Sequence, residues 1–129
     1  MTRYLSKMEA DDIHIEGIDA VAGCALYYDD VEMFVMILRS FATNTPAVLE
    51  EIKIVNPDSL MDYQLRIHGI KSTCATIGAE VLRGRAYELE MYAKDGNVEA
   101  ILQANDPLIA DVYALIDRIL AWLDTIIED

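Results

Sequence analysis

Apolar residues recur at intervals of three and four along most of this chain, which is the spacing of one face of an α-helix. The last and longest stripe comprises Leu108, Ile109, Val112, Leu115, Ile116, Ile119, Leu120, Leu123, Ile126 and Ile127. No segment sustains the alternation typical of a strand, and no Asn-Gly or Asp-Gly pair joins two β-rich runs. Several amphipathic stretches with short connections predict an all-α fold: an antiparallel four-helix bundle with a short additional N-terminal helix.

Capping residues and prolines set the expected ends of these helices. The expected caps are Asp19, Asp29 or Asp30, Asp58 or Ser59, and Asn97. The expected helices span approximately 20–26, 30–53, 59–78 and 82–93, followed by a short segment at 97–102 and a last helix that ends near 127. Pro46 marks a kink or the start of a new turn, and Asn105 or Asp106 followed by Pro107 opens the last helix.

The chain has 129 residues, of which 53% are hydrophobic, so we expect one domain with a single core. Residues 1–14 are expected to form a flexible segment, and residues 15–129 the helical bundle. No apolar run approaches the roughly 18 residues of a membrane span, and the N-terminus lacks the apolar core of a signal peptide. A cytoplasmic protein without membrane insertion is expected.

The two cysteines, Cys24 and Cys74, match no metal-ligand spacing and form no disulfide framework. Cys74 lies on the apolar face of its helix, where a free thiol behaves as a small hydrophobe. A disulfide between the two is disfavoured in the cytoplasm but is left open by the sequence. We expect no metal and no cofactor.

The net charge of −13 argues against binding to nucleic acid or to an anionic membrane surface. The acidic residues are spread unevenly, because the segment from Ser59 to Lys94 holds five basic and four acidic residues. The charge of this nearly neutral segment differs from that of the acidic remainder either by chance or because the segment has to accommodate an anion.

His68 lies in this segment and faces away from the apolar stripe of its helix. Residues three and four positions away share its surface, namely Gln64, Leu65, Lys71 and Ser72. One turn further lie Met61, Ala75 and Ala79, so Met61, Leu65, Ala75 and Ala79 form an expected docking surface around the imidazole. Gly78 is expected to let a neighbouring helix approach closely, which would bring Glu90 beside His68.

These residue types suit phosphoryl transfer. Neutral imidazole, whose ordinary pKa is about 6.5, is a nucleophile near neutral pH and can take up and return a phosphoryl group. Lys71 would counter the negative charge of the transferred group, and Ser72 would donate a hydrogen bond to it. Gln64 or Glu90 would orient the other ring nitrogen.

The segment IHGIKSTCATIGAEVLRGRAYELEMYAKDGN resembles the core of a histidine-containing phosphotransfer (HPt) domain. The family motif is a histidine, a lysine three residues on, a small residue after it and a later glycine-alanine pair; an Ala-x-x-Leu-Glu element follows. The matching residues here are His68, Lys71, Ser72, Gly78, Ala79, Ala86, Leu89 and Glu90. The resemblance extends over residues 17–121. One departure is Ser72, where family members usually have glycine.

The resemblance implies a four-helix bundle that exposes a phospho-accepting histidine. It also implies partners, namely the receiver domains of response regulators and of a hybrid histidine kinase, which carry the phosphoryl group on aspartate. The Mg²⁺ of such transfers belongs to the receiver. The chain would then be a phosphocarrier without ATP-dependent kinase activity, and a monomer is expected because a symmetric dimer could cover His68.

Two other functions remain open. Asp58-Ser59-Leu60 resembles the attachment site of acyl carrier proteins, in which Ser59 would hold a phosphopantetheine arm. A helical interaction module with an inert histidine would have a similar composition. A kinase is disfavoured, because the chain has no Gly-rich phosphate loop and is too short to add an ATP-binding domain.

Overall fold

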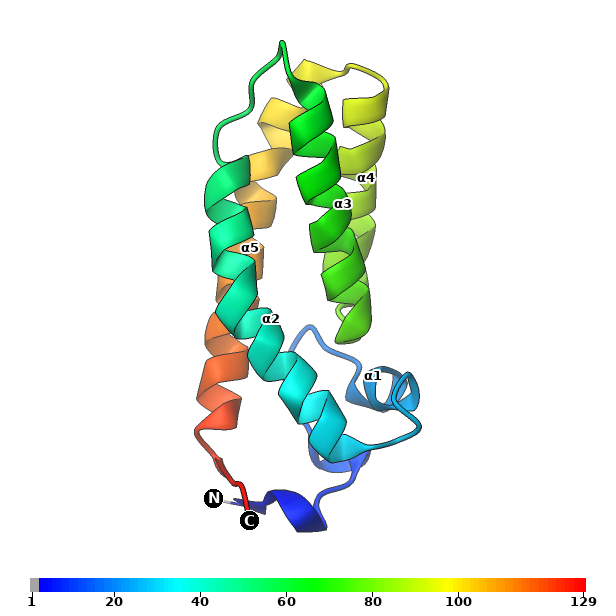
Figure 1. Cartoon of the computed structure of the whole chain (residues 1–129), viewed down its shortest axis with the longest axis vertical. Helices are drawn as coiled ribbons and strands as arrows, with labels where there is room; N and C mark the ends of the chain where they lie inside the picture. The colour runs from blue at the N-terminus through cyan, green and yellow to red at the C-terminus, as the bar shows by residue number, and fades with distance from the viewer. Residues whose placement is uncertain (1–2) are drawn as a thin grey trace.

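The computed structural model describes residues 3–129, which are mostly α-helical, as predicted (Figure 1). Within this range there are five α-helices: α1 (Ala20–Ala25), α2 (Val31–Ile52), α3 (Leu60–Thr76), α4 (Glu80–Lys94) and α5 (Val98–Leu123). Two 3₁₀ turns, at Leu5–Lys7 and Ala10–Asp12, precede α1. Strands β1 (Arg3–Tyr4) and β2 (Ile126–Ile127) form a short parallel pair. None of the helices in this range has the length and apolar content needed to cross a membrane.

The four long helices pack around one hydrophobic core (Figure 1). Helix α3 packs against α4, α4 against α5, α5 against α2, and α2 against α3, while α1 contacts the start of α2. Fully buried side chains from all four long helices fill the centre, including Phe34, Leu38, Ile67, Ile70, Leu89, Leu108 and Ile119. Burial of these apolar surfaces is the main force that holds the helices in register.

Side-chain caps begin three of the helices at the residues that the sequence indicated. Asp19 accepts from the backbone N–H of Ala22 at 3.0 Å, and Asp30 accepts from that of Met33 at 3.0 Å. Asn97 does the same for Ala100 at 3.2 Å. Each bond satisfies a donor that has no partner within the first helical turn.

Helix α5 differs from the expectation, because the segment at 97–102 and the last helix form one continuous helix that contains Pro107. Asn105 does not cap a helix. Its side chain is buried, where it donates to the Ile52 carbonyl at 2.8 Å and accepts from the Tyr63 hydroxyl at 2.8 Å. Because the side-chain amide of Asn105 is bonded to α2 and α3, its oxygen does not cap a helix. Helix α2 likewise continues through Pro46.

The C-terminal end of the chain also differs from the expectation. The last helix ends at Leu123. Ile126 and Ile127, which the sequence assigned to its apolar stripe, lie outside the helix and pair with β1. Within residues 3–14, part of the segment for which the sequence predicts flexibility, Met8 and Ile13 are buried in the core. The backbone N–H of Ser6 donates to the Asp129 side chain at 2.9 Å, which ties the two ends of the chain together.

Candidate functional site

Helix α3 holds His68 on its outer face. Ile67, Ile70 and Cys74 of the same helix are buried in the core, whereas the His68 side chain is 56% exposed. Because the buried neighbours fix the rotation of the helix about its axis, the imidazole stays at the surface.

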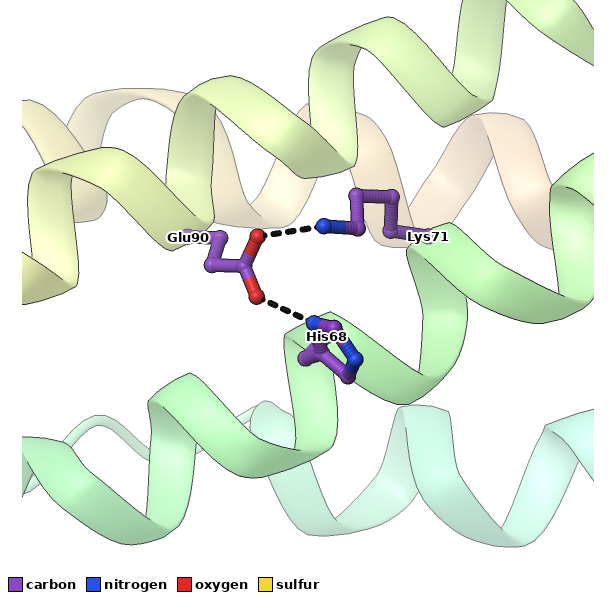
Figure 2. A network of polar contacts seen from close by, with 3 residues as sticks. All are labelled: His68, Lys71 and Glu90. Atoms are coloured by element: carbon purple, nitrogen blue, oxygen red, sulfur yellow. Dashed lines mark hydrogen bonds and ion pairs between the residues drawn. The ribbon is translucent and has the colours of Figure 1, made fainter.

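Glu90 of α4 lies beside His68 and joins it to Lys71 (Figure 2). One carboxylate oxygen, Oε2, is 2.5 Å from Nδ1 of His68, and the other, Oε1, is 2.7 Å from Nζ of Lys71. The Glu90 side chain is only 3% exposed and that of Lys71 is 21% exposed. A carboxylate at a nearly closed position between two helices thus receives two donors, one on each oxygen.

The protonation state of Glu90 follows from two opposing effects. Burial raises the pKa of Glu90, but the hydrogen bonds and charges of Lys71 and His68 outweigh burial and leave that pKa below its ordinary value of 4.5. Glu90 is therefore a carboxylate at neutral pH and only accepts hydrogen bonds. It follows that Nδ1 of His68 carries a proton, and that in the neutral ring the lone pair lies on Nε2. Figure 2 shows Nε2 on the side of the ring away from Glu90.

Lys71 makes two contacts that the sequence did not indicate. Its ammonium group is bonded to Glu90 and also lies over the ring of Tyr87, with Nζ 5.5 Å from the ring centroid. Tyr87 had not been identified from the sequence. A signal for it does exist, since Tyr87 lies three residues before Glu90 and so shares its face of α4.

The remaining site residues are placed as follows. Met61 and Leu65 are each 63% exposed, Ser72 is exposed, and Gln64 and Ala75 are half-buried. Of the two residues expected to orient the ring, Glu90 is the one that bonds Nδ1 of His68.

Ala79 does not belong to the docking surface. Its exposed fraction is 0%, and it lies at the N-cap of α4. The expectation failed because α3 ends at Thr76, so its periodicity does not extend to residue 79.

Gly78 allows a close approach, but of the backbone before α1. Its φ is +74°, and a Cβ at this position would lie 2.4 Å from the carbonyl oxygen of Asp19. The Asp19 N–H donates to the Gly78 carbonyl at 3.0 Å. A glycine is therefore required at this point by both conformation and space.

A cavity of about 250 Å³ lies between α2 and α3, on the side of the histidine helix away from Glu90. Val48, Gly69, Ile70 and Thr73 contribute to its lining. A Cβ added at Gly69 would meet no atom within 4 Å, so the helix surface next to His68 is open on this side.

Neither cysteine is suited to act as a nucleophile. Both are buried and free, and burial, helped by nearby acidic residues, raises the pKa of Cys24 to about 11 and that of Cys74 to about 12. Across the described part of the chain, no group of three or more His, Cys, Asp or Glu side chains is placed to hold a metal ion.

No protein-family model, curated protein or solved structure matches the chain.

Proposed function

We propose that this protein is a histidine phosphotransfer protein of a multistep phosphorelay. His68 takes a phosphoryl group from the aspartyl phosphate of one receiver domain and passes it to the aspartate of another. The observation that carries the proposal is the exposed imidazole whose Nδ1 is held by a buried carboxylate, because in the neutral ring the lone pair then lies on Nε2, away from Glu90.

The transfer needs no redox partner and no ATP. The Nε2 lone pair attacks phosphorus, an N–P bond forms, and the O–P bond of the aspartyl phosphate breaks, so that the receiver carboxylate leaves with the electron pair. The ring then gains positive charge, which Glu90 stabilises through Nδ1–H. Attack by a second receiver carboxylate reverses these steps and restores the neutral ring.

The neighbouring side chains support this chemistry. Lys71 supplies the positive charge nearest to Glu90, and we propose that it counters the charge of the phosphoryl group during transfer. Ser72 is exposed on the same side of α3 as His68, where its hydroxyl would donate to a phosphoryl oxygen. Gln64 is half-buried one turn before His68 and would contact the incoming partner.

The partner surface around His68 is partly apolar. Exposed Leu65 lies one turn and exposed Met61 two turns before the histidine, and Ala75 lies two turns after it. We propose that receiver domains of response regulators and of a hybrid histidine kinase dock here. The cavity beside Gly69 offers space for an apolar side chain of such a receiver.

This function goes with a particular architecture and setting. We infer an HPt-type antiparallel four-helix bundle made of α2–α5, with α1 as the additional short helix. A monomer fits the proposal, because the site must accept two receivers in turn. Receiver domains exchange phosphoryl groups in the cytoplasm, and we place the protein there.

Transfer of label from a phosphorylated receiver tests the proposal. The protein is mixed with a receiver domain that carries ³²P on its aspartate, and label is followed with time. We expect acid-labile, alkali-stable label on the wild type and none on His68→Gln. The matched control is His14→Gln, because His14 is the other histidine and is also exposed. Label that survives in His68→Gln contradicts the proposal, as does a phosphopantetheine adduct on Ser59 in the intact mass of the cellular protein.

The position of the phosphoryl group on the ring is a second readout. Because Glu90 occupies the Nδ1 side, we expect phosphorylation at Nε2. ³¹P NMR, or antibodies that distinguish the two phosphohistidine isomers, identify the nitrogen. Phosphate on Nδ1 would mean that the Glu90 hydrogen bond does not direct the reaction.

A further inference from the structure

Lys71 is a flexible side chain that this structure holds in one place. Its ammonium group donates to Oε1 of Glu90 at 2.7 Å, and the same nitrogen lies 5.5 Å from the centroid of the Tyr87 ring. Only 21% of the Lys71 side chain is exposed, although it starts on the outer part of α3. Lysine has several rotatable bonds and is normally solvated, so these contacts restrict it strongly.

Tyr87 is well placed to cause this restriction. It lies three residues before Glu90 on α4, so that the ring and the carboxylate face Lys71 from the same helix. Tyr87 is 46% exposed, and its ring covers part of the Lys71 side chain, of which 21% is exposed. The negative face of an aromatic ring attracts a cation, and the reduced access of water strengthens the neighbouring ion pair.

We propose that Tyr87 is a positioning residue of this site, which holds Lys71 on Glu90 and so keeps a positive charge ready beside His68. The consequence for transfer rests on the proposed phosphotransfer function, whereas the effect on the position of Lys71 does not. Without the ring, Lys71 samples the solvent and must be ordered again for each transfer.

Chemical labelling of the amine tests the position of Lys71 without any phosphotransfer. Wild type, Tyr87→Leu and Tyr87→Phe are treated briefly with an amine-acetylating reagent, and peptide mass spectrometry gives the rate at each lysine. Lys94, which is exposed at the C-terminal end of α4, is the internal reference. We expect Lys71 of Tyr87→Leu to react about two- to fivefold faster than in wild type, and Tyr87→Phe to behave as wild type because the ring is kept. Equal Lys71 rates in all three proteins overturn the proposal.

Transfer rates test the functional part. We expect Tyr87→Leu to slow phosphoryl transfer to His68 about two- to fivefold, with the rate restored in Tyr87→Phe. In a Lys71→Met background the Tyr87→Leu substitution should have no further effect, because the ring acts through the ammonium group. Additive losses in the double variant overturn this part.

The two measurements separate the two ideas. If no protein of the set accepts label on His68, the proposed function is wrong, and the labelling rates still decide whether Tyr87 positions Lys71. If His68 is labelled but the Leu variant transfers as fast as wild type, the function stands and the role of Tyr87 is refuted.

Discussion

Glu90 is a buried charge that is stable because each of its oxygens has a donor. Burial of an isolated carboxylate is strongly unfavourable, and the usual outcome is that the group becomes neutral. Here Lys71 supplies a hydrogen bond and opposite charge at 2.7 Å, and His68 supplies a hydrogen bond at 2.5 Å. The same arrangement determines which nitrogen of the neutral His68 ring has no bond to Glu90, so the proposed transfer and the local stability both depend on Glu90.

A dependence of stability on pH follows from Glu90. Its pKa is lower in the folded protein than the ordinary value of 4.5, so the unfolded chain binds the proton first as pH falls. The stabilisation is therefore present above about pH 4.5 and is lost as pH decreases through the folded pKa. Urea unfolding between about pH 6 and pH 3 should show a smaller loss of stability in Glu90→Gln than in wild type.

Glu88→Gln is the matched control for this experiment, since Glu88 is exposed two residues earlier in α4. It should follow the wild-type curve. A Glu90→Gln curve parallel to that of wild type would show that the carboxylate makes no net contribution.

At the scale of single residues, the sequence predicted the position of His68 better than its contacts. The spacing of Ile67, Ile70 and Cys74 suffices to turn His68 outward, because helical periodicity is a local property. The contact with Glu90 depends on how α3 and α4 slide against each other, which a single sequence does not show. The choice between Gln64 and Glu90 and the contact of Lys71 with the Tyr87 ring therefore needed the structure.

At the scale of helices, starts were easier to predict than interruptions. Asp19, Asp30 and Asn97 cap helices through bonds to residues three positions on, which are local contacts. Asn105 looks like a cap in the sequence, but its partners are Ile52 and Tyr63, more than forty residues away. Pro107 has no backbone N–H, so the carbonyl of Gln103, four residues earlier in α5, loses its usual helical donor. Gln103 is exposed, so water can take the place of this donor.

The turn between α3 and α4 makes a prediction at this scale. Gly78→Ala places a methyl group 2.4 Å from the Asp19 carbonyl oxygen and forces a positive φ on an L-residue. We expect a loss of at least about 2 kcal/mol in the free energy of unfolding. Denaturant unfolding followed by circular dichroism measures it.

Gly84→Ala is the control for this substitution. Gly84 lies inside α4, and a Cβ there meets no atom within 4 Å. Because alanine is the better helix former, this variant should gain about 0.5–1 kcal/mol. If Gly78→Ala were as stable as wild type, Asp19 and α1 would have to move away from the turn.

At the scale of the whole molecule, the helix class and the single core follow from periodic apolar stripes. The closure of the molecule does not, because it depends on pairs that are distant in sequence. The N-terminal residues join the C-terminal ones through β1 and β2, and Figure 1 shows the two ends side by side. Polar residues and short apolar runs in residues 3–14 give no periodic signal, although Met8 and Ile13 reach the core.

A segment that packs in this way contributes to global stability, whereas a loose one does not. Ile13 is 4% exposed, so Ile13→Ala should remove about 2–4 kcal/mol from the free energy of unfolding through lost burial and a cavity. His14→Ala, at the exposed neighbouring position, should change it by less than about 0.5 kcal/mol. Urea unfolding of the two variants measures both values in the same segment. Equal and negligible effects would mean that residues 3–14 are detached in solution, and then the core would be that of the helices alone.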